Sequence, residues 1–556
     1  MPTAPDDHPP DQPADGLGAG GRPGPVDPPG PVRSDHLTSF NEPAPWPLDL
    51  DHLAWRRGLG AVRQLARAQV PDLVRSRRLP PLRRLARTTL VLGLAVLPWV
   101  LTERRRGGSS SRRDISRRLR RAFERLGPSY IKLGQVISSG EGILPDELVS
   151  EFRTLRDRVP AESFETVRAV VEADLGRPLK EVFAHFDGEP VAAASIAQVH
   201  LATLVTGEPV AVKVQRPGID RLVAEDLAVM TWLAPPLTRR IDLLKLVNLP
   251  AVIELFAETV VEELDFRLEA ENMLDVALVL DRTGQRAIAV PRPHPTLVTR
   301  RVLVMERMSG FAFDDVDGIR AAHVDTAAVV RACLISLLEG AMIFGVFHGD
   351  LHGGNLFIQL DGRVALLDYG ITGRLEPARR LVFLRMLLAA MVGDHRSVLA
   401  GYQQLGAIAP DADLDAFLAD IPVDRPPIDP GEVDADQMIA EMRRVTKALV
   451  RYGTRLPKEL MLFMKDFLFI DAAMTTLAPD LDVVSEMLHI SEYFLNNHGA
   501  QIAHEIGLDA SAIRLDPEIL RGALGLPTDG STDTHREIRQ ARQDVRRKVE
   551  ESRRRP

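Results

Sequence analysis

The spacing of apolar residues changes several times along the chain. From about residue 113 to 180, apolar residues recur every three or four positions, as in "RRLRRAFERLGPSYIKLGQVI", and this period predicts amphipathic helices. Near residue 190, the runs "VHLATLV" and "VAVKVQ", joined by "TGEP", predict a β-hairpin. A helical pattern returns over 220–281 and "VLVMERM" predicts a further strand. From 322 the pattern is mainly helical around the short strands "LFIQL" and "VALLD". A small sheet-rich region followed by a larger helical one predicts an α+β fold.

Three segments of the chain differ in composition from the rest. Residues 1–45 are rich in Pro, Gly and Asp and lack the basic and apolar regions of a signal peptide, so we expect a disordered tail. Residues 410–436 are acidic and contain proline, which predicts an exposed loop. Residues 496–556 end in a highly charged run, which predicts a charged helical tail with a solvated face.

Among the 556 residues there is one cysteine, Cys333. A lone cysteine excludes an internal disulfide framework and is typical of a reducing compartment, which predicts a cytoplasmic location. Cys333 lies in an apolar run, where we expect a small buried side chain rather than a nucleophile.

An apolar run of 14 residues, "TTLVLGLAVLPWVL" (88–101), is too short to span a bilayer reliably. Arginines flank it on both sides: Arg83, Arg84 and Arg87 before it, Arg104, Arg105 and Arg106 after it. Two interpretations remain open, a helix lying on an anionic membrane surface and a helix packed against its own domain. No other stretch is expected to cross a membrane. The arginine-rich segments lack interleaved aromatic residues, so we expect no nucleic-acid partner.

Three short motifs carry residues suited to phosphoryl transfer. Lys213 lies in "VAVKVQ", where a strand lysine can hold nucleotide phosphates. "FHGDLHGGNLFI" contains His348, Asp350 and Asn355, with the Asp-to-Asn spacing of a kinase catalytic loop. Asp368 lies in a D-Y-G triplet after a predicted strand. Asp350 could orient or deprotonate the attacking group, and Asn355 and Asp368 offer the oxygen ligands that Mg²⁺ prefers.

Two further motifs narrow the class of protein. "AAASIAQVH", with Ala193, Ala194 and Ser195, stands where a kinase has its glycine-rich loop, and alanine makes such a loop stiffer. Upstream, "YIKLGQVISS" contains Lys132 and Gln135 in a KxGQ pattern. Downstream, "VEELDFRLEAENM" contains Glu263 and Asp265 in an ExD pattern. With these motifs the chain resembles the ABC1/UbiB (AarF) family of atypical kinases over roughly residues 110–480.

The resemblance implies a protein-kinase-like, two-lobed fold with a helical N-terminal extension that carries KxGQ. The chain then divides into the tail 1–45, a basic region with a short apolar helix (46–112), the extension (113–185), a sheet-rich lobe with inserted helices (186–310), a helical lobe (311–495) and the tail 496–556.

The resemblance also implies residue roles. Lys213 would pair with Glu269, and Asp350, Lys213 and His348 would form the catalytic set. Lys132 and Gln135 would regulate the site from the extension, with Lys132 reaching toward Glu263 and Asp265. The backbone from Glu306 to Met308 would contact adenine, the alanine-rich loop would cover the phosphates, and Asn355 and Asp368 would hold Mg²⁺ with ATP or ADP. The chain departs from the family's HADxHPGN pattern at Gly349 and Gly353, and there the shape of the loop is in doubt.

The function implied is an ATP- and Mg²⁺-dependent atypical kinase or ATPase, peripheral at a membrane, that supports isoprenoid lipid or quinone biosynthesis alongside the proteins of that pathway. After Asp368 the chain passes into helix without an A-P-E motif, so a platform for protein substrates is not expected. Two alternatives remain. One is a small-molecule phosphotransferase of the aminoglycoside or choline kinase type, which shares the H-G-D-x-x-x-x-N spacing but lacks KxGQ. The other is a nucleotide-gated lipid-binding scaffold without turnover.

Overall fold

The computed structural model describes residues 37–75, 81–102, 108–138, 145–155, 159–241, 249–391, 394–420, 457–507 and 534–540. All structural statements below concern these residues. Most of the tail predicted over 1–45, the part of the acidic loop from residue 421 and most of the tail predicted over 496–556 lie outside them.

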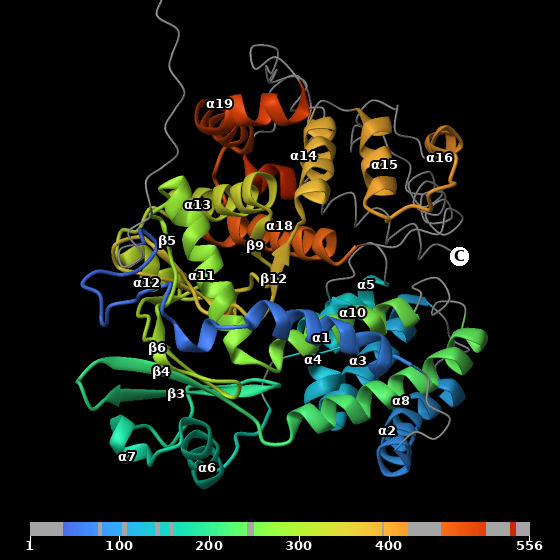
Figure 1. Cartoon of the computed structure of the whole chain (residues 1–556). Helices are drawn as coiled ribbons and strands as arrows, with labels where there is room; N and C mark the ends of the chain where they lie inside the picture. The colour runs from blue at the N-terminus through green and yellow to red at the C-terminus, as the bar shows by residue number, and fades with distance from the viewer. Residues whose placement is uncertain are drawn as a thin grey trace, which may run out of the picture.

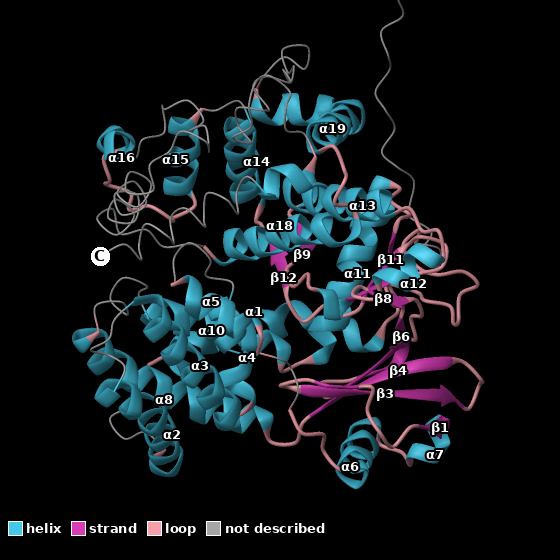
Figure 2. Cartoon of the chain, turned by 180° about the vertical axis from the view of Figure 1, so that it is seen from behind, coloured by secondary structure: helices cyan, strands magenta, loops and turns pink. Residues whose placement is uncertain are grey.

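The largest sheet has six strands in the order β1-β3-β4-β7-β6, with β2 paired to β3 at its side (Figures 1 and 2). These strands are β1 (Phe183–Phe186), β2 (Ala192–Ala193), β3 (Ala197–Leu204), β4 (Pro209–Gln215), β6 (Pro293–Val298) and β7 (Val302–Glu306). The predicted hairpin is confirmed, because β3 and β4 pair antiparallel from Ala197 opposite Gln215 to Thr203 opposite Pro209.

The two faces of this sheet pack against different helices. Strand side chains alternate between faces, so Val210, Val212 and Val214 of β4 pack on one side with α6 (Phe164–Leu175). Ala211 lies on the other side, in the core that contains α11 (Phe266–Thr283). The same alternation turns Lys213 toward α11, which decides the geometry of the site described below.

The helical part of the chain surrounds two small sheets, β5-β11-β10-β8 and β12-β9 (Figure 2). Their strands are β5 (Ile288–Ala289), β8 (Phe311–Ala312), β9 (Val346–His348), β10 (Leu356–Ile358), β11 (Val364–Leu366) and β12 (Thr372–Arg374). The helices around them are α12 (Val316–Ala321), α13 (Thr326–Glu339), α14 (Pro377–Met391), α15 (His395–Gln404), α16 (Leu414–Asp420), α18 (Lys458–Leu477) and α19 (Val483–Ile506). The predicted short strands at "LFIQL" and "VALLD" are thus confirmed as β10 and β11.

A second group of helices lies beside the large sheet and has its own apolar core (Figure 1). It consists of α1 (Leu59–Leu73), α2 (Leu82–Thr102), α3 (Gly108–Leu126), α4 (Pro128–Ser138), α5 (Asp146–Arg153), α8 (Ile219–Arg240) and α10 (Leu249–Glu263). Leu227, Phe256 and Val260 are fully buried in this core. Within the helical stretch predicted over 220–281, the described residues form α8, α10 and α11, and α8 and α10 pack with the extension.

Residues 37–56, which we call the strap, run from the helical region to the large sheet. Leu37, Phe40, Leu48 and Trp55 are buried in the main core. The predicted tail is therefore too long at its C-terminal end, because apolar residues scattered among prolines are anchored by tertiary contacts that composition does not reveal. Other predicted boundaries also fall within elements: residue 112 lies in α3, 185 in β1 and 495 in α19.

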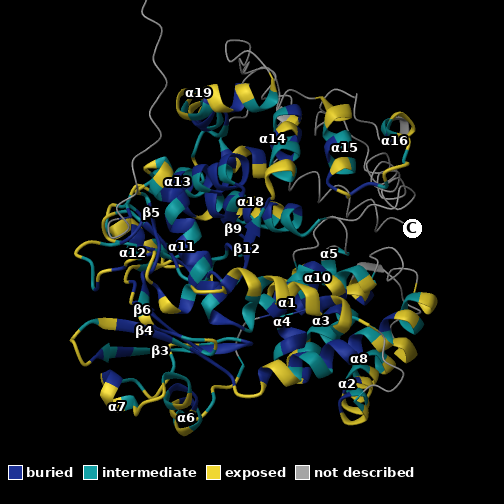
Figure 3. Cartoon of the chain, in the orientation of Figure 1, coloured by how far each residue is buried: buried dark blue, intermediate teal, exposed yellow. Residues whose placement is uncertain are grey.

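Helix α2 extends beyond the predicted apolar run to 21 residues. By length and composition it could cross a membrane, as could residues Thr326–Phe344. The second stretch is mostly buried, as expected for a core helix, whereas only 6% of the apolar window of α2 is buried (Figure 3). The helix is thus longer than the apolar run of 88–101 that predicted it, and the burial of Thr326–Phe344 agrees with the expectation that no other stretch crosses a membrane.

Candidate active site

Lys213 projects from β4 toward the first turn of α11. Its Nζ lies 2.7 Å from Oε1 of Glu269 and 3.3 Å from Oδ2 of Asp368. Burial disfavours the charge on Lys213, but the two carboxylates outweigh it and raise its pKa above the ordinary value. Phe266, one turn before Glu269, places its ring centroid 5.5 Å from the ammonium. The lysine therefore stays charged and links the sheet, α11 and the D-Y-G loop.

His348 ends β9 and joins two loops through its imidazole. Its Nε2 lies 2.5 Å from the carbonyl oxygen of Asp368, and its Nδ1 accepts the N–H of Asp350 at 3.2 Å. This arrangement requires a neutral ring that donates from Nε2, and burial lowers the pKa of His348 accordingly. The ring also meets Tyr369 edge-on, with centroids 5.1 Å apart. Sequence analysis placed His348 in the catalytic set, but both of its nitrogens are engaged with the backbone, so its role here is to position the loops.

The proposed metal ligands Asn355 and Asp368 flank one hairpin. Asn355 precedes β10 and Asp368 follows β11, and these strands pair antiparallel, so both residues lie at the same end. Leu367 N–H donates to the carbonyl of Asn355 at 3.0 Å and closes that end.

The donor set of this hairpin suits Mg²⁺. The Asn355 amide nitrogen donates to the carbonyl of Asp350 at 3.2 Å, which leaves its amide oxygen as a ligand. Burial raises the pKa of Asp368, but Lys213 and Lys132 outweigh it and lower that pKa to about 2. One carboxylate and one amide fit a hard cation whose other ligands are phosphates and water. Among the described residues, no group of three or more His, Cys, Asp or Glu is arranged to hold a metal by itself.

Asp350 is in ion-pair contact with Lys465 of α18, a residue that sequence analysis missed. Burial raises the pKa of Asp350, but the positive charges of Lys465 and Lys132 more than reverse this effect and leave its pKa below the ordinary range. The next residue of α18, Asp466, accepts the N–H of Leu351 at 2.9 Å. No spacing rule connects α18 to a loop more than 100 residues earlier, so no sequence signal was available.

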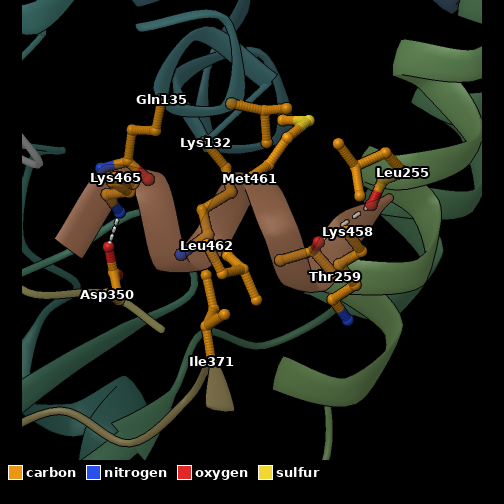
Figure 4. Close-up of a pocket in the computed structure, with 11 residues that line it drawn as sticks. Lys132, Gln135, Leu255, Thr259, Asp350, Ile371, Lys458, Met461, Leu462 and Lys465 are labelled. Atoms are coloured by element: carbon orange, nitrogen blue, oxygen red, sulfur yellow. Dashed lines mark hydrogen bonds and ion pairs between the residues drawn. The ribbon is translucent and has the colours of Figure 1, made fainter. Parts of the chain in front are cut away.

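A cavity reaches Asp350 from the side of α18 (Figure 4). Helices α4, α10 and α18 form its walls, and the lysines among the lining residues come from α4 and α18. The lining residues are Lys132, Gln135, Val136, Leu255, Thr259, Asp350, Ile371, Lys458, Met461, Leu462 and Lys465. The Asp350 side chain is 15% exposed, so water reaches it from this cavity.

The KxGQ segment forms α4 and faces this site. Lys132 Nζ lies 2.8 Å from Oε1 of Glu263, and Gln135 lines the cavity. Gly134 lets α4 pack closely on its neighbour, since a Cβ there would lie 2.3 Å from Leu155. Asp265 caps α11 through the N–H of Arg267 at 3.1 Å and forms an ion pair with the same arginine.

The alanine-rich loop is fixed by a buried arginine that sequence analysis did not single out. Arg216 donates to the carbonyl of Ala194 at 3.0 Å and to the carbonyl of Pro160 at 2.9 Å. Ala193 pairs with β3, and Ser195 is 4% exposed. The loop is thus held to the segment that leads from the extension into the sheet.

The hinge predicted at Glu306 to Met308 follows β7. The strap crosses it: the side-chain amide of Asn41 donates to Oε1 of Glu306 at 3.0 Å and to the sulfur of Met308 at 3.4 Å. Glu306 also accepts the N–H of Arg292. The side chains of Glu306 and Met308 are buried, and contact of this backbone with adenine stays a prediction.

A strand lysine paired with a helix glutamate, a loop with an Asp-to-Asn spacing of five, and an aspartate after the next hairpin define a kinase-like site. The comparisons agree, because a family model described as an ABC1 atypical kinase-like domain matches residues 154–401. An uncharacterized protein of Mycobacterium tuberculosis (strain H37Rv) is 38% identical over 69% of this chain and 78% of its own.

Two further relatives carry family names. An uncharacterized aarF domain-containing protein kinase of Arabidopsis thaliana, chloroplastic, is 32% identical over 66% of this chain and 73% of its own. A probable protein kinase UbiB of Marinobacter nauticus is 32% identical over 66% of this chain and 68% of its own. The chain belongs to the ABC1/UbiB family of atypical kinases.

Proposed function

We propose that the chain binds Mg-ATP beside Lys213 and transfers or hydrolyses its γ-phosphoryl group, and that this activity supports isoprenoid lipid or quinone biosynthesis. One observation carries the proposal: the ammonium of Lys213 contacts both Glu269 and Asp368. A cation for the phosphates and a carboxylate for the metal therefore lie together, as phosphoryl transfer requires. The pathway rests on family membership alone.

The test is ATP hydrolysis by the purified full chain with Mg²⁺, in the presence and absence of anionic liposomes. Asp368→Asn removes the metal carboxylate and should abolish turnover. Asp361→Asn is the matched control, because Asp361 lies exposed at the turn of the same hairpin. Turnover that survives Asp368→Asn would contradict the assigned metal site.

A second candidate is a nucleotide-gated lipid-binding scaffold, favoured by the contact of Lys132 with Glu263. Helix α4 holds a lysine against the acidic side of the site, which restricts access to Asp350 and disfavours large acceptors. ATP binding without turnover, with and without liposomes, would favour the scaffold.

We propose that α2 is the helix that contacts the membrane. Leu90, Leu94, Leu97 and Leu101 recur at helical spacing and are 63%, 60%, 56% and 70% exposed. They form one face, which we call the leucine face. The opposite face is anchored in the protein, where Arg84 pairs with the buried Asp226. We propose that the two open interpretations both hold, with α2 packed on its own domain and its leucine face available for peripheral contact with a membrane.

A further inference from the structure

Two consecutive residues of α18 contact two consecutive residues of the loop that carries the proposed catalytic aspartate. Lys465 forms an ion pair with Asp350, and Asp466 accepts the N–H of Leu351. Asp466 is fully buried, and its second carboxylate oxygen has no hydrogen-bond partner among the described residues. Burying a carboxyl group costs free energy. The hydrogen bond that Asp466 accepts from Leu351 fixes the register between α18 and this loop. The position of Lys465 is therefore fixed relative to Asp350.

The location of Lys465 determines what its ammonium can reach. Asp350 would orient the attacking oxygen, so it must lie within hydrogen-bond distance of that oxygen. The transferring phosphoryl group lies next to the same oxygen. An ammonium in contact with Asp350 is therefore one side-chain movement away from the phosphoryl oxygens. Lys465 can make that movement, because its four-carbon stem is flexible and its side chain is 24% exposed.

Three lysines approach the site from three different sides. Lys213 lies against Glu269 and Asp368 on the sheet side, and Lys132 lies against Glu263 on the extension side. Lys465 approaches from α18, the one helix of the C-terminal region whose lysine meets Asp350 among the described residues. Transferred phosphoryl groups carry charge on three equatorial oxygens, and preorganised cations are the main means of stabilising it.

We propose that Lys465 is a catalytic residue of the phosphoryl transfer: its ammonium rests on Asp350 without nucleotide and contacts the transferring phosphoryl group when Mg-ATP is bound. In the step, the bond between the attacking oxygen and the γ-phosphorus forms, and the bond from that phosphorus to the bridging oxygen breaks. The electron pair of the broken bond leaves with ADP, and the proton of the attacking water or hydroxyl passes to Asp350 and then to solvent. Lys465 stays protonated throughout.

This inference rests on the proposed function, and the experiment separates the two. The full chain is compared with Lys465→Met and Lys465→Arg by kcat for ATP and by Kd for a fluorescent ATP analogue. Lys465→Met should lower kcat by about 100-fold or more while Kd changes less than about threefold, and Lys465→Arg should restore much of kcat. Lys180→Met is the matched control. Lys180 is an exposed lysine of α7 (Leu179–Val182) and does not line the cavity at Asp350, so its kcat should stay within about twofold.

A second comparison distinguishes action on the phosphoryl group from action through Asp350. In an Asp350→Asn background, Lys465→Met should lower kcat further. No further loss, or parallel loss of kcat and ATP affinity without rescue by arginine, would overturn the assigned role. Unchanged kcat in Lys465→Met would overturn it while the proposed function stands. A wild-type chain that binds ATP without turnover would overturn both. If Lys465→Met fails to fold in a thermal unfolding assay, Lys465→Gln provides the same comparison.

Discussion

The ammonium of Lys132 lies 2.8 Å from a carboxylate oxygen of Glu263. This contact joins the extension to the acidic side of the site. Burial raises the pKa of Glu263, Lys132 opposes this effect, and the nearby carboxylates of Asp368 and Asp350 add to it. Removing the lysine leaves a buried carboxylate facing other carboxylates, which is strongly unfavourable.

Lys132→Met should therefore lower the free energy of unfolding by about 3 kcal/mol, measured by urea denaturation. The double variant Lys132→Met/Glu263→Gln should recover most of this loss, because the glutamine is neutral. If the double variant is no more stable than the single one, the pairing of these two residues is not the source of the effect.

Replacing Arg84 tests how α2 is anchored. Its guanidinium pairs with Asp226, which is fully buried, and donates to the carbonyl of Leu126 at 2.7 Å. Arg84→Met should destabilise the extension by about 3–5 kcal/mol, because Asp226 keeps its burial and loses its partner. The exposed neighbour Arg83 is the control, with an expected change within about 0.5 kcal/mol. Hydrogen exchange over α2 and α8 reports the change locally, and equal protection in both variants would refute this anchor.

The leucine face should determine membrane binding. Burying a leucine contributes about 1.5–3 kcal/mol, so Leu94→Ser/Leu97→Ser should weaken binding to anionic liposomes by at least about tenfold per leucine. Flotation of the full chain measures this. Leu65→Ser is the control, because Leu65 is 62% exposed on α1, outside this face. Equal flotation of all three proteins would exclude α2 as the contact.

Cys333 should be chemically protected in the folded chain. Burial raises the pKa of its thiol to about 12, and the thiolate is the reactive form. At pH 8 its alkylation by iodoacetamide should be about a thousandfold slower than in the urea-unfolded chain. Because the sequence contains no other cysteine, mass spectrometry of the intact protein gives the rate directly. Cys333 is half-buried, so rapid labelling of the folded chain would contradict the raised pKa of its thiol.

Local patterns in the sequence predicted much of the site. The alternation of β4 predicts a strand, and the Asp-to-Asn spacing predicts a loop that ends at a hairpin. The pairing of Lys213 with Glu269 came from family resemblance, and the structure places the two groups in contact. Contacts between distant segments were not predictable, because no spacing rule governs them. Lys465 with Asp350, Arg84 with Asp226 and Asn41 with Glu306 all depend on how separate helices and the strap pack.

The contacts of the strap bear on which residues a fragment of this protein must contain. Asn41 donates to Glu306 at the end of β7 and accepts from Arg363 of the β10–β11 hairpin at 2.9 Å, so one residue tethers the large sheet to this hairpin. The segment that the family model matches, 154–401, contains neither Asn41 nor Lys132 nor Lys465. That segment is thus smaller than the set of residues in contact around the site, and a fragment trimmed to it would lose the tether and two of the cations around its acidic centre.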